Sequence, residues 1–188
     1  MEMQIKGSAV MSMRDFIKHK YGKDGFDKWV NSLSPEAKNI YINPILSTVW
    51  FPARKTLFEP GEKLVEILAN GDKSVTKEAG RYSAEIVLTG IYKLLIKIGS
   101  PEFLIKKASS IMTTFYKEGA AMTAESVGDK KVSTKITEFL DPHYVAENRI
   151  MGWTEKAMEL SGAKDINIEV AKTMTAGDPY TEFIVTWK

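Results

Sequence analysis

The chain has 188 residues, contains no cysteine and carries a net charge of +2, from 26 basic and 24 acidic residues. The lack of cysteine excludes disulfides, thiolate metal sites and cysteine nucleophiles, and it fits a reducing compartment. Charges this evenly balanced do not form the clustered basic surface of a nucleic-acid-binding protein, so no nucleic-acid partner is expected.

The length predicts one domain, residues 1–188. A cytoplasmic location is expected from the lack of an apolar segment of the kind that signal peptides and membrane spans contain. A chain of this size buries roughly 70% of its unfolded surface, so it needs no disulfide or metal to fold. Charged side chains interrupt residues 1–20, which excludes the apolar core of a signal peptide. No stretch approaches the ~18 consecutive apolar residues of a membrane span.

Helical periodicity dominates residues 1–119, the predicted helical half. After a short mixed segment, apolar residues spaced three and four apart predict short helices over 13–21 and 26–33. Ser34-Pro35 predicts the next helix start, because serine caps free N–H groups and proline is tolerated in the first turn. Asn43-Pro44 and Phe51-Pro52 mark boundaries between further short helices. Three more helices are predicted, over residues 60–68, 74–98 and 101–119.

The helix predicted over residues 74–98 has one apolar face and one polar face. Lys77, Arg81 and Glu85 fall on the polar face, which we expect to contact water.

After residue 119 the pattern changes to that of strands, which predicts a second half over residues 120–188. Segments 120–127 and 131–139 flank Gly128-Asp129-Lys130, a turn sequence typical of a hairpin. A second hairpin is predicted at the C-terminus, with Gly177-Asp178-Pro179 in its turn. Between the hairpins, Ile150, Trp153 and Ala157 belong to one face of a helix predicted over residues 144–161. The sequence therefore predicts an α+β fold: an N-terminal helical half, then a four-stranded antiparallel sheet (hairpin–helix–hairpin) packed on helices.

No group of residues in the sequence forms a recognisable catalytic or metal-binding motif. His19 lies among lysines and is expected on the surface, and His143 is expected to be a loop or cap residue at a helix start. No glycine-rich phosphate loop and no Gly-x-Ser-x-Gly motif occurs. We therefore expect a non-enzymatic protein with no metal ion and no cofactor, although an enzyme of unknown type is the minority alternative.

The helical half is rich in aromatic residues and methionine. Such residues at helical spacing are usually part of a core, but some of them can line a cavity for an apolar ligand between helices. The candidate ligand-binding residues are Trp50, Tyr82, Ile86, Met112, Phe115 and Tyr116. Lysines at 93, 97, 106 and 107 are expected on the water-facing sides of two helices, with an anionic ligand or lipid headgroup as the alternative.

The order of elements and several local strings resemble a superfamily that contains haem nitric oxide/oxygen-binding domains, 4-vinyl reductase domains and TRAPP subunits. Lys6-Gly7 and the segment up to Leu33 resemble the opening of the haem-binding branch, and Phe103–Tyr116 resembles its haem-contacting helix. Thr173–Phe183 resembles the end of the 4-vinyl reductase pattern. The helices that contain Gly80-Arg81 and Phe103–Phe115 also resemble an uncharacterised family abundant in myxobacteria. These matches are collinear over about 180 residues.

This sequence departs from the resemblance at the positions that hold inorganic groups. The axial histidine of the haem branch falls at Met112 or an immediate neighbour, and the Tyr-x-Ser-x-Arg motif that holds the haem propionates has no counterpart near Lys131–Phe139. Thr173 and Thr181 stand where metal-binding cysteines often occur in 4-vinyl reductase domains, and hydroxyls are poor zinc ligands. The resemblance therefore implies the fold without its haem or its metal.

Together these observations predict a non-enzymatic small-molecule-binding or sensor module. We expect an apolar or lipid-like ligand to bind between the helical half and the sheet, without haem. Two alternatives stay open. One is a haem-binding gas sensor that uses Met112 or His143 as the axial ligand. The other is a structural interaction module of the TRAPP type, which works as a homodimer.

Overall fold

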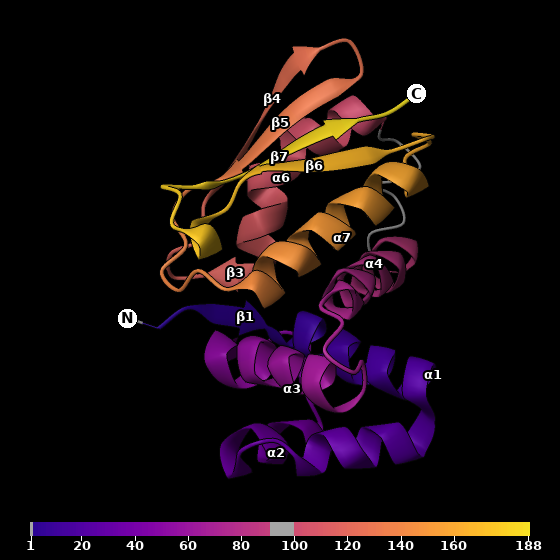
Figure 1. The fold of residues 1–188 in the computed structure, drawn as a ribbon, viewed down its shortest axis with the longest axis vertical. Coiled ribbons are helices and arrows are strands. Elements are labelled where there is room, and N and C mark those ends of the chain that lie inside the picture. Colours follow the sequence, from indigo (N-terminus) through magenta and orange to yellow (C-terminus); the bar gives the residue numbers. More distant parts are fainter. Residues whose placement is uncertain (1, 91–99) are drawn as a thin grey trace.

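The computed structural model describes residues 2–90 and 100–188, and Figure 1 shows the arrangement of the elements. From the N-terminus to residue 90 the elements are β1 (Gln4–Lys6), α1 (Gly7–Asn31), α2 (Pro35–Ile42), β2 (Trp50–Pro52), a π-helical turn (Arg54–Phe58), α3 (Glu59–Ile67) and α4 (Ser74–Thr89). After residue 99 they are α6 (Pro101–Phe115), β3 (Tyr116–Lys117), β4 (Met122–Gly128), β5 (Lys131–Ile136), α7 (Tyr144–Leu160), β6 (Asn167–Lys172), a 3-10 turn (Met174–Ala176) and β7 (Thr181–Thr186). None of the described helices has both the length and the apolar character needed to cross a membrane.

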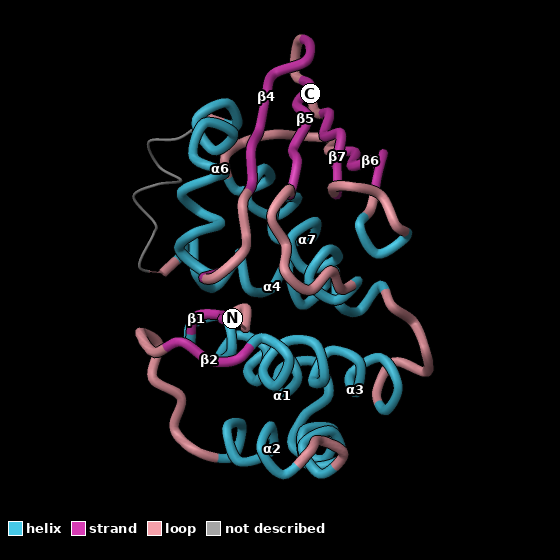
Figure 2. Tube along the Cα trace, turned by 90° about the vertical axis from the view of Figure 1, so that its left-hand side faces the viewer, coloured by secondary structure: helices cyan, strands magenta, loops and turns pink. Residues whose placement is uncertain are grey.

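The second half forms a four-stranded antiparallel sheet with the strand order β4-β5-β7-β6. Alternate residues of β7 (Thr181, Phe183 and Val185) are buried, which is the period expected of a strand with one covered face. Figures 1 and 2 show α6 and α7 on the covered side of the sheet, with α4, α1 and then α2 farther from it. The predicted α+β class, with hairpin, helix and hairpin in this order, is confirmed.

A second sheet was not predicted from the sequence. It contains three short strands in the order β2-β1-β3, in which Ile5 pairs with Phe51 on one side and with Tyr116 on the other. The prediction of short helices around Phe51-Pro52 is therefore wrong, and the helix predicted over 101–119 ends at Phe115. Strands of two or three residues are too short to show an alternating pattern, and their partners are distant in sequence.

Helix α1 begins at Gly7, six residues before the predicted start at residue 13. Buried Ala9, Val10 and Met13 continue the helical spacing toward the N-terminus. The two predicted helices over 13–21 and 26–33 are one element with a sharp break at Gly22, whose φ of 68° favours glycine.

Local signals fixed several helix starts correctly. Ser34 accepts a hydrogen bond from the N–H of Ala37 at 3.4 Å, as expected of a capping serine. His143 caps α7: its Nδ1 accepts from the N–H of Val145 at 3.2 Å, and its ring stacks on Phe58. The helix predicted over residues 74–98 is described from Ser74 to Thr89, and residues 91–99 lie outside the described ranges.

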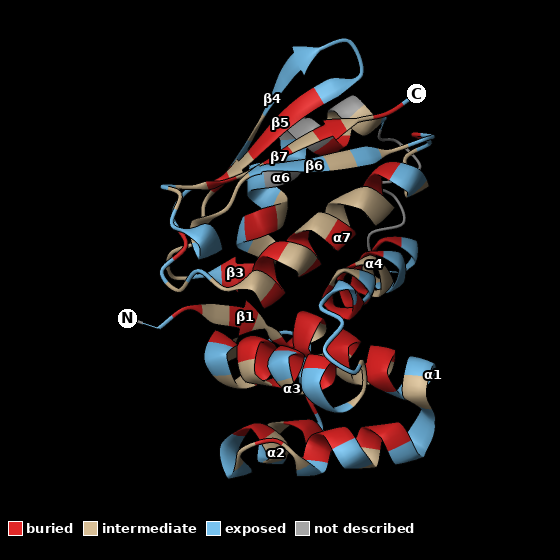
Figure 3. Ribbon diagram, in the orientation of Figure 1, coloured by how far each residue is buried: buried red, intermediate tan, exposed pale blue. Residues whose placement is uncertain are grey.

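The hydrophobic core contains residues from both halves of the chain. Trp29 and Ile17 from α1 and Phe183 from β7 are among its largest fully buried side chains. Figure 3 shows the buried residues concentrated where α1, α4 and α7 meet and along the inner strands of the sheet.

Two glycines allow α4 and α7 to pack with their backbones in direct contact. A Cβ atom added at Gly80 would overlap the carbonyl oxygen of Arg149, and one added at Gly152 would overlap the carbonyl oxygen of Lys77. Side chains larger than hydrogen at these two positions would hold the helices apart. The distance between α4 and α7 therefore depends on both glycines.

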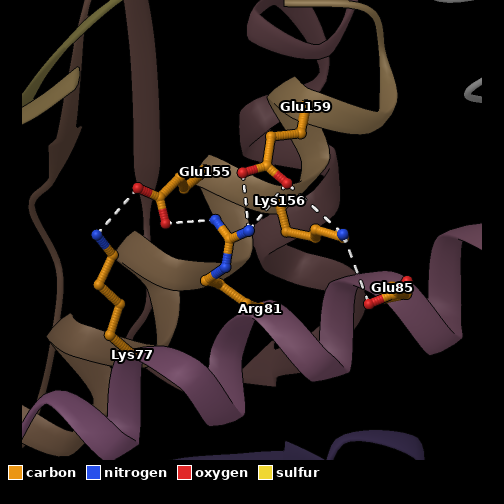
Figure 4. Close-up of polar contacts among 6 residues, drawn as sticks. All are labelled: Lys77, Arg81, Glu85, Glu155, Lys156 and Glu159. Carbon is orange, nitrogen blue, oxygen red and sulfur yellow. Dashed lines mark hydrogen bonds and ion pairs between the residues drawn. The ribbon is translucent and has the colours of Figure 1, made fainter. Parts of the chain in front are cut away.

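Charged residues line one side of this helix pair, as Figure 4 shows. Lys77 donates to Glu155 at 3.0 Å, and Arg81 bridges Glu155 and Glu159, the latter at 2.7 Å. Burial by itself would raise the pKa of Glu155, but the hydrogen bonds from Lys77 and Arg81 outweigh it and hold the pKa below its ordinary value. The prediction that Lys77 and Arg81 simply contact water is wrong, because their side chains are half-buried against α7.

We expect Gly80→Ala to lower the free energy of unfolding by about 3 kcal/mol or more, because the new methyl group overlaps backbone that cannot move as a side chain can. In an ordinary helix the same change would stabilise the protein by about 1 kcal/mol. Urea unfolding followed by circular dichroism measures the difference. Ser109→Ala, at an exposed position of α6, serves as the control and should change stability little. A Gly80→Ala protein as stable as the wild type would contradict the close packing.

Candidate functional site

A cavity of about 90 Å³ lies between α6, α7 and the four-stranded sheet, and residues of β1, α1 and α4 also line it. Apolar side chains form most of its wall. They include Met112 and Phe115 from α6, Val132 from β5, and Ile150 and Met158 from α7. The cavity is partly open, and it lies where buried residues of the helical half and of the sheet half meet.

Three of the six candidate residues line this cavity and three do not. Met112, Phe115 and Tyr116 are at its wall. Trp50 lies in β2, with the Lys6 ammonium 5.7 Å from its ring centroid. The other two lie on α4, away from the cavity: Tyr82 packs on Phe16, with 5.7 Å between ring centroids, and 49% of Ile86 is exposed. The sequence located α6 correctly as a wall, but it could not show which face of α4 the cavity would meet.

Helix α7 supplies lining residues that the sequence did not single out as ligand-binding residues. Ile150, Trp153 and Ala157 were predicted to share one helix face, and all three line the cavity. Arg149 also lines it and is only 4% exposed. A charged residue next to an apolar stripe is ordinarily expected in water, so no sequence signal identified Arg149 as a cavity residue.

Within residues 2–90 and 100–188, the polar contacts of the Arg149 side chain are long and go to neutral atoms of α1. Its Nη2 lies 3.5 Å from the carbonyl oxygen of Ala9 and 3.3 Å from Oγ of Ser12, and its Nη1 lies 3.6 Å from Sδ of Met13. Burial lowers the pKa of Arg149, because the charged form loses its hydration. Arg149 and Ala9 both line the cavity, and Nη2 of Arg149 lies beside the carbonyl oxygen of Ala9.

The residues at this cavity do not fit a haem group. None of its lining residues is a histidine. His19 is exposed on α1, and His143 is held at the start of α7, where its Nε2 lies 3.1 Å from Oε1 of Glu62. Met112 is buried at the wall, but a volume of about 90 Å³ is far below the roughly 300–1,000 Å³ of pockets that hold drug-sized ligands.

Thr173 and Thr181 stand where the resemblance to 4-vinyl reductase domains places metal-binding cysteines. In the structure their hydroxyls donate hydrogen bonds to a buried carboxylate. Glu147 of α7 is 8% exposed, and it accepts hydrogen bonds from the hydroxyls of Thr173, Thr175 and Thr181. The Thr173 hydroxyl lies 2.7 Å from the carboxylate. No group of three or more metal-ligating side chains occurs in residues 2–90 and 100–188. This cluster ties the C-terminal hairpin to α7.

The hydrogen bonds to Glu147 also determine its protonation. Burial by itself would raise the pKa of Glu147, but the bonds from Thr175, Thr181 and Thr173 outweigh it and hold the pKa below its ordinary value of 4.5. The carboxylate form is thus the form that the folded protein prefers.

We expect Glu147→Gln to lower the free energy of unfolding at pH 7 by about 1–3 kcal/mol, because an amide cannot accept all of these bonds. Since the folded-state pKa of Glu147 is lowered, its contribution is complete above about pH 4.5 and is lost as the pH falls through the folded-state value. The difference in stability between wild type and variant should therefore shrink below that pH in denaturant titrations. A difference that stays constant from pH 7 to pH 3 would contradict this assignment.

No protein-family model matches the chain, and no curated protein matches it in sequence. Among solved structures, the chain is similar to an H-NOX protein from S. oneidensis in the Fe(II)NO ligation state, with a TM-score of 0.77, 13% sequence identity, and coverage of 98% of this chain and 99% of that chain. It is also similar to the Fe(II) unliganded H-NOX protein from K. algicida, with a TM-score of 0.70, 14% identity, and coverage of 98% and 97%. The I5F mutant of T. tengcongensis H-NOX is similar with a TM-score of 0.69 and 10% sequence identity, and the match covers 98% of each chain.

The chain therefore has the H-NOX fold over nearly its whole described length. The resemblance to haem nitric oxide/oxygen-binding domains is confirmed at the level of the fold. Sequence identities of 10–14% show the fold alone, so the function has to be inferred from the residues at the cavity.

Proposed function

We propose that this protein is a non-enzymatic small-molecule-binding module, with the ligand in the cavity between α6, α7 and the sheet and without haem. The observation that carries this proposal is the cavity itself, which has an apolar wall and a few polar groups. Concave apolar sites with a small number of polar groups are the usual form of a ligand pocket. Its volume favours a ligand smaller than a drug-sized molecule.

A sensor role follows from the position of the cavity. Its wall includes Ile5 of β1, Gly80 of α4 and Val185 of β7, so a bound molecule would contact both halves of the chain. A ligand that binds one relative position of the halves more tightly than another shifts the population toward that position. The similarity to H-NOX proteins, whose structures were solved in the Fe(II)NO and the Fe(II) unliganded states, supports a ligand-dependent module of this fold.

The homodimer, the cytoplasmic location and the single domain of residues 1–188 stay predictions. The interaction-module alternative of the TRAPP type depends on the homodimer. The haem-sensor alternative has Met112 at the cavity wall as a non-histidine ligand, but the cavity volume of about 90 Å³ does not favour it.

We expect filling the cavity to abolish ligand binding. Ala157→Leu adds three carbon atoms at a buried position of the wall. Benzyl alcohol, 1-hexanol, benzoate and hexanoate form a panel of small apolar probes. At a concentration of 100 times its Kd, a bound probe should raise the Tm of the wild type by about 5–10 °C, and it should not raise the Tm of the variant.

Ala171→Leu is the matched control, because it makes the same change at an exposed position of β6 and should leave the response to the probes unchanged. Circular dichroism shows whether Ala157→Leu folds. Native mass spectrometry of wild-type protein from its own host provides an independent measurement, because it reports any bound mass. If no probe shifts the Tm and no extra mass is found, the proposal fails.

Reconstitution with haem should give no Soret band typical of a bound, ligated haem. The cavity offers Met112 but no histidine, and its volume is too small for the macrocycle. Absorption spectra after haem addition and desalting measure this, with Met112→Leu and His143→Ala proteins as controls. A Soret band that disappears in either variant would instead support the haem-sensor alternative.

A further inference from the structure

One positive charge at the cavity wall has no counter-ion in the described chain. Among the described residues that line the cavity, Arg149 alone carries a formal charge, and none is an aspartate or glutamate. Its contacts are a thioether sulfur, a carbonyl oxygen and a hydroxyl, at 3.3–3.6 Å. A buried ion without a partner of opposite charge is costly, and proteins ordinarily pair such ions. The site is therefore electrostatically incomplete.

The other polar groups of the wall can also donate hydrogen bonds. Trp153 Nε1–H is buried and has no hydrogen-bond partner within residues 2–90 and 100–188. Indole N–H is a donor only, so this group requires an acceptor. Tyr116 and Thr134, which also carry hydroxyl groups, line the same cavity. Buried donors without partners are rare in native proteins, so the unpaired indole N–H of a residue that lines this cavity is informative.

The number and geometry of these donors restrict the ligand. One guanidinium balances one negative charge, so a phosphate dianion would leave a second charge unpaired in an apolar cavity. The planar fork of arginine matches the two oxygens of a carboxylate. Most of the remaining wall is apolar and fits a short hydrocarbon or a single aromatic ring.

We infer that the ligand of this cavity is a small apolar carboxylic acid, bound as its anion, with its carboxylate paired to Arg149 and its apolar body between α6 and the sheet. This inference rests on the proposed function and adds the chemical class of the ligand. Trp153 Nε1–H donates a further hydrogen bond to the acid, and Tyr116 lies at the same wall. Arg149 is a binding residue in this account, not a structural one.

Matched pairs of acid and alcohol test the inference. Hexanoate is compared with 1-hexanol, and benzoate with benzyl alcohol, by isothermal titration calorimetry at pH 7. The wild type should bind each acid more tightly than its alcohol. Arg149→Met should weaken binding of the acids by at least about thirtyfold, because the bound carboxylate would lose its partner of opposite charge. The same variant should bind the alcohols as the wild type does.

Two further variants separate this role from a general structural one. Arg14→Met removes one positive charge from a partly exposed position of α1 and should not affect either class of probe. Arg149→Lys keeps the charge but loses the planar fork, so it should bind the acids with intermediate affinity. Because the charge of Arg149 lacks a counter-ion, Arg149→Met should fold at least as stably as the wild type when no ligand is present.

The possible results distinguish the failure of this inference from the failure of the proposed function. If the wild type binds acids and alcohols equally, or if Arg149→Met binds the acids as the wild type does, the inference is wrong while the cavity is still a ligand site. If neither class binds the wild type, the proposed function fails as well. If Arg149→Met does not fold, the comparison of Arg149→Lys with the wild type decides the inference on the same acid and alcohol pairs.

Discussion

The direct backbone contact between α4 and α7 is the constraint on which the arrangement of the cavity depends. Gly80 faces the carbonyl of Arg149, and Gly152 faces the carbonyl of Lys77, so the two helices approach as closely as backbones can. This contact brings Ser83 of α4 to the same wall as the residues of α7. We attribute the fixed spacing to the glycines and not to the ion pairs in Figure 4, because a Cβ at either glycine would overlap backbone atoms, whereas the ion pairs lie along one side of the helix pair.

Helix α7 carries two buried charges whose environments differ sharply. Glu147 and Arg149 are two residues apart, so they point to nearly opposite sides of the helix. Three threonine hydroxyls complete the environment of Glu147 and tie the C-terminal hairpin to the helix. Arg149, which lines the cavity, has long contacts with neutral atoms of α1 and no counter-ion among the described residues. A satisfied buried charge serves the fold, whereas an unsatisfied one at a cavity indicates a missing partner.

The H-NOX fold is retained here with different residues at the positions that the sequence resemblance associates with inorganic groups. Met112 lies in the cavity wall among apolar side chains, and Thr173 and Thr181 donate hydrogen bonds to Glu147 instead of coordinating an ion. At these positions the side chains pack in the cavity wall or hydrogen-bond within the chain. The shared fold is therefore compatible with a ligand of a different chemical class.

The sequence by itself determined the α+β class, both hairpins and the starts of the capped helices. These features depend on neighbours in the chain: Ser34 and His143 cap the next turn, and Gly128-Asp129 forms a turn within four residues. Only the tertiary structure decided that Ile5 pairs with both Phe51 and Tyr116, because such pairing joins distant segments. It also decided that the cavity contains Met112 and Arg149 but neither Trp50 nor Tyr82, since helix crossing determines which faces meet.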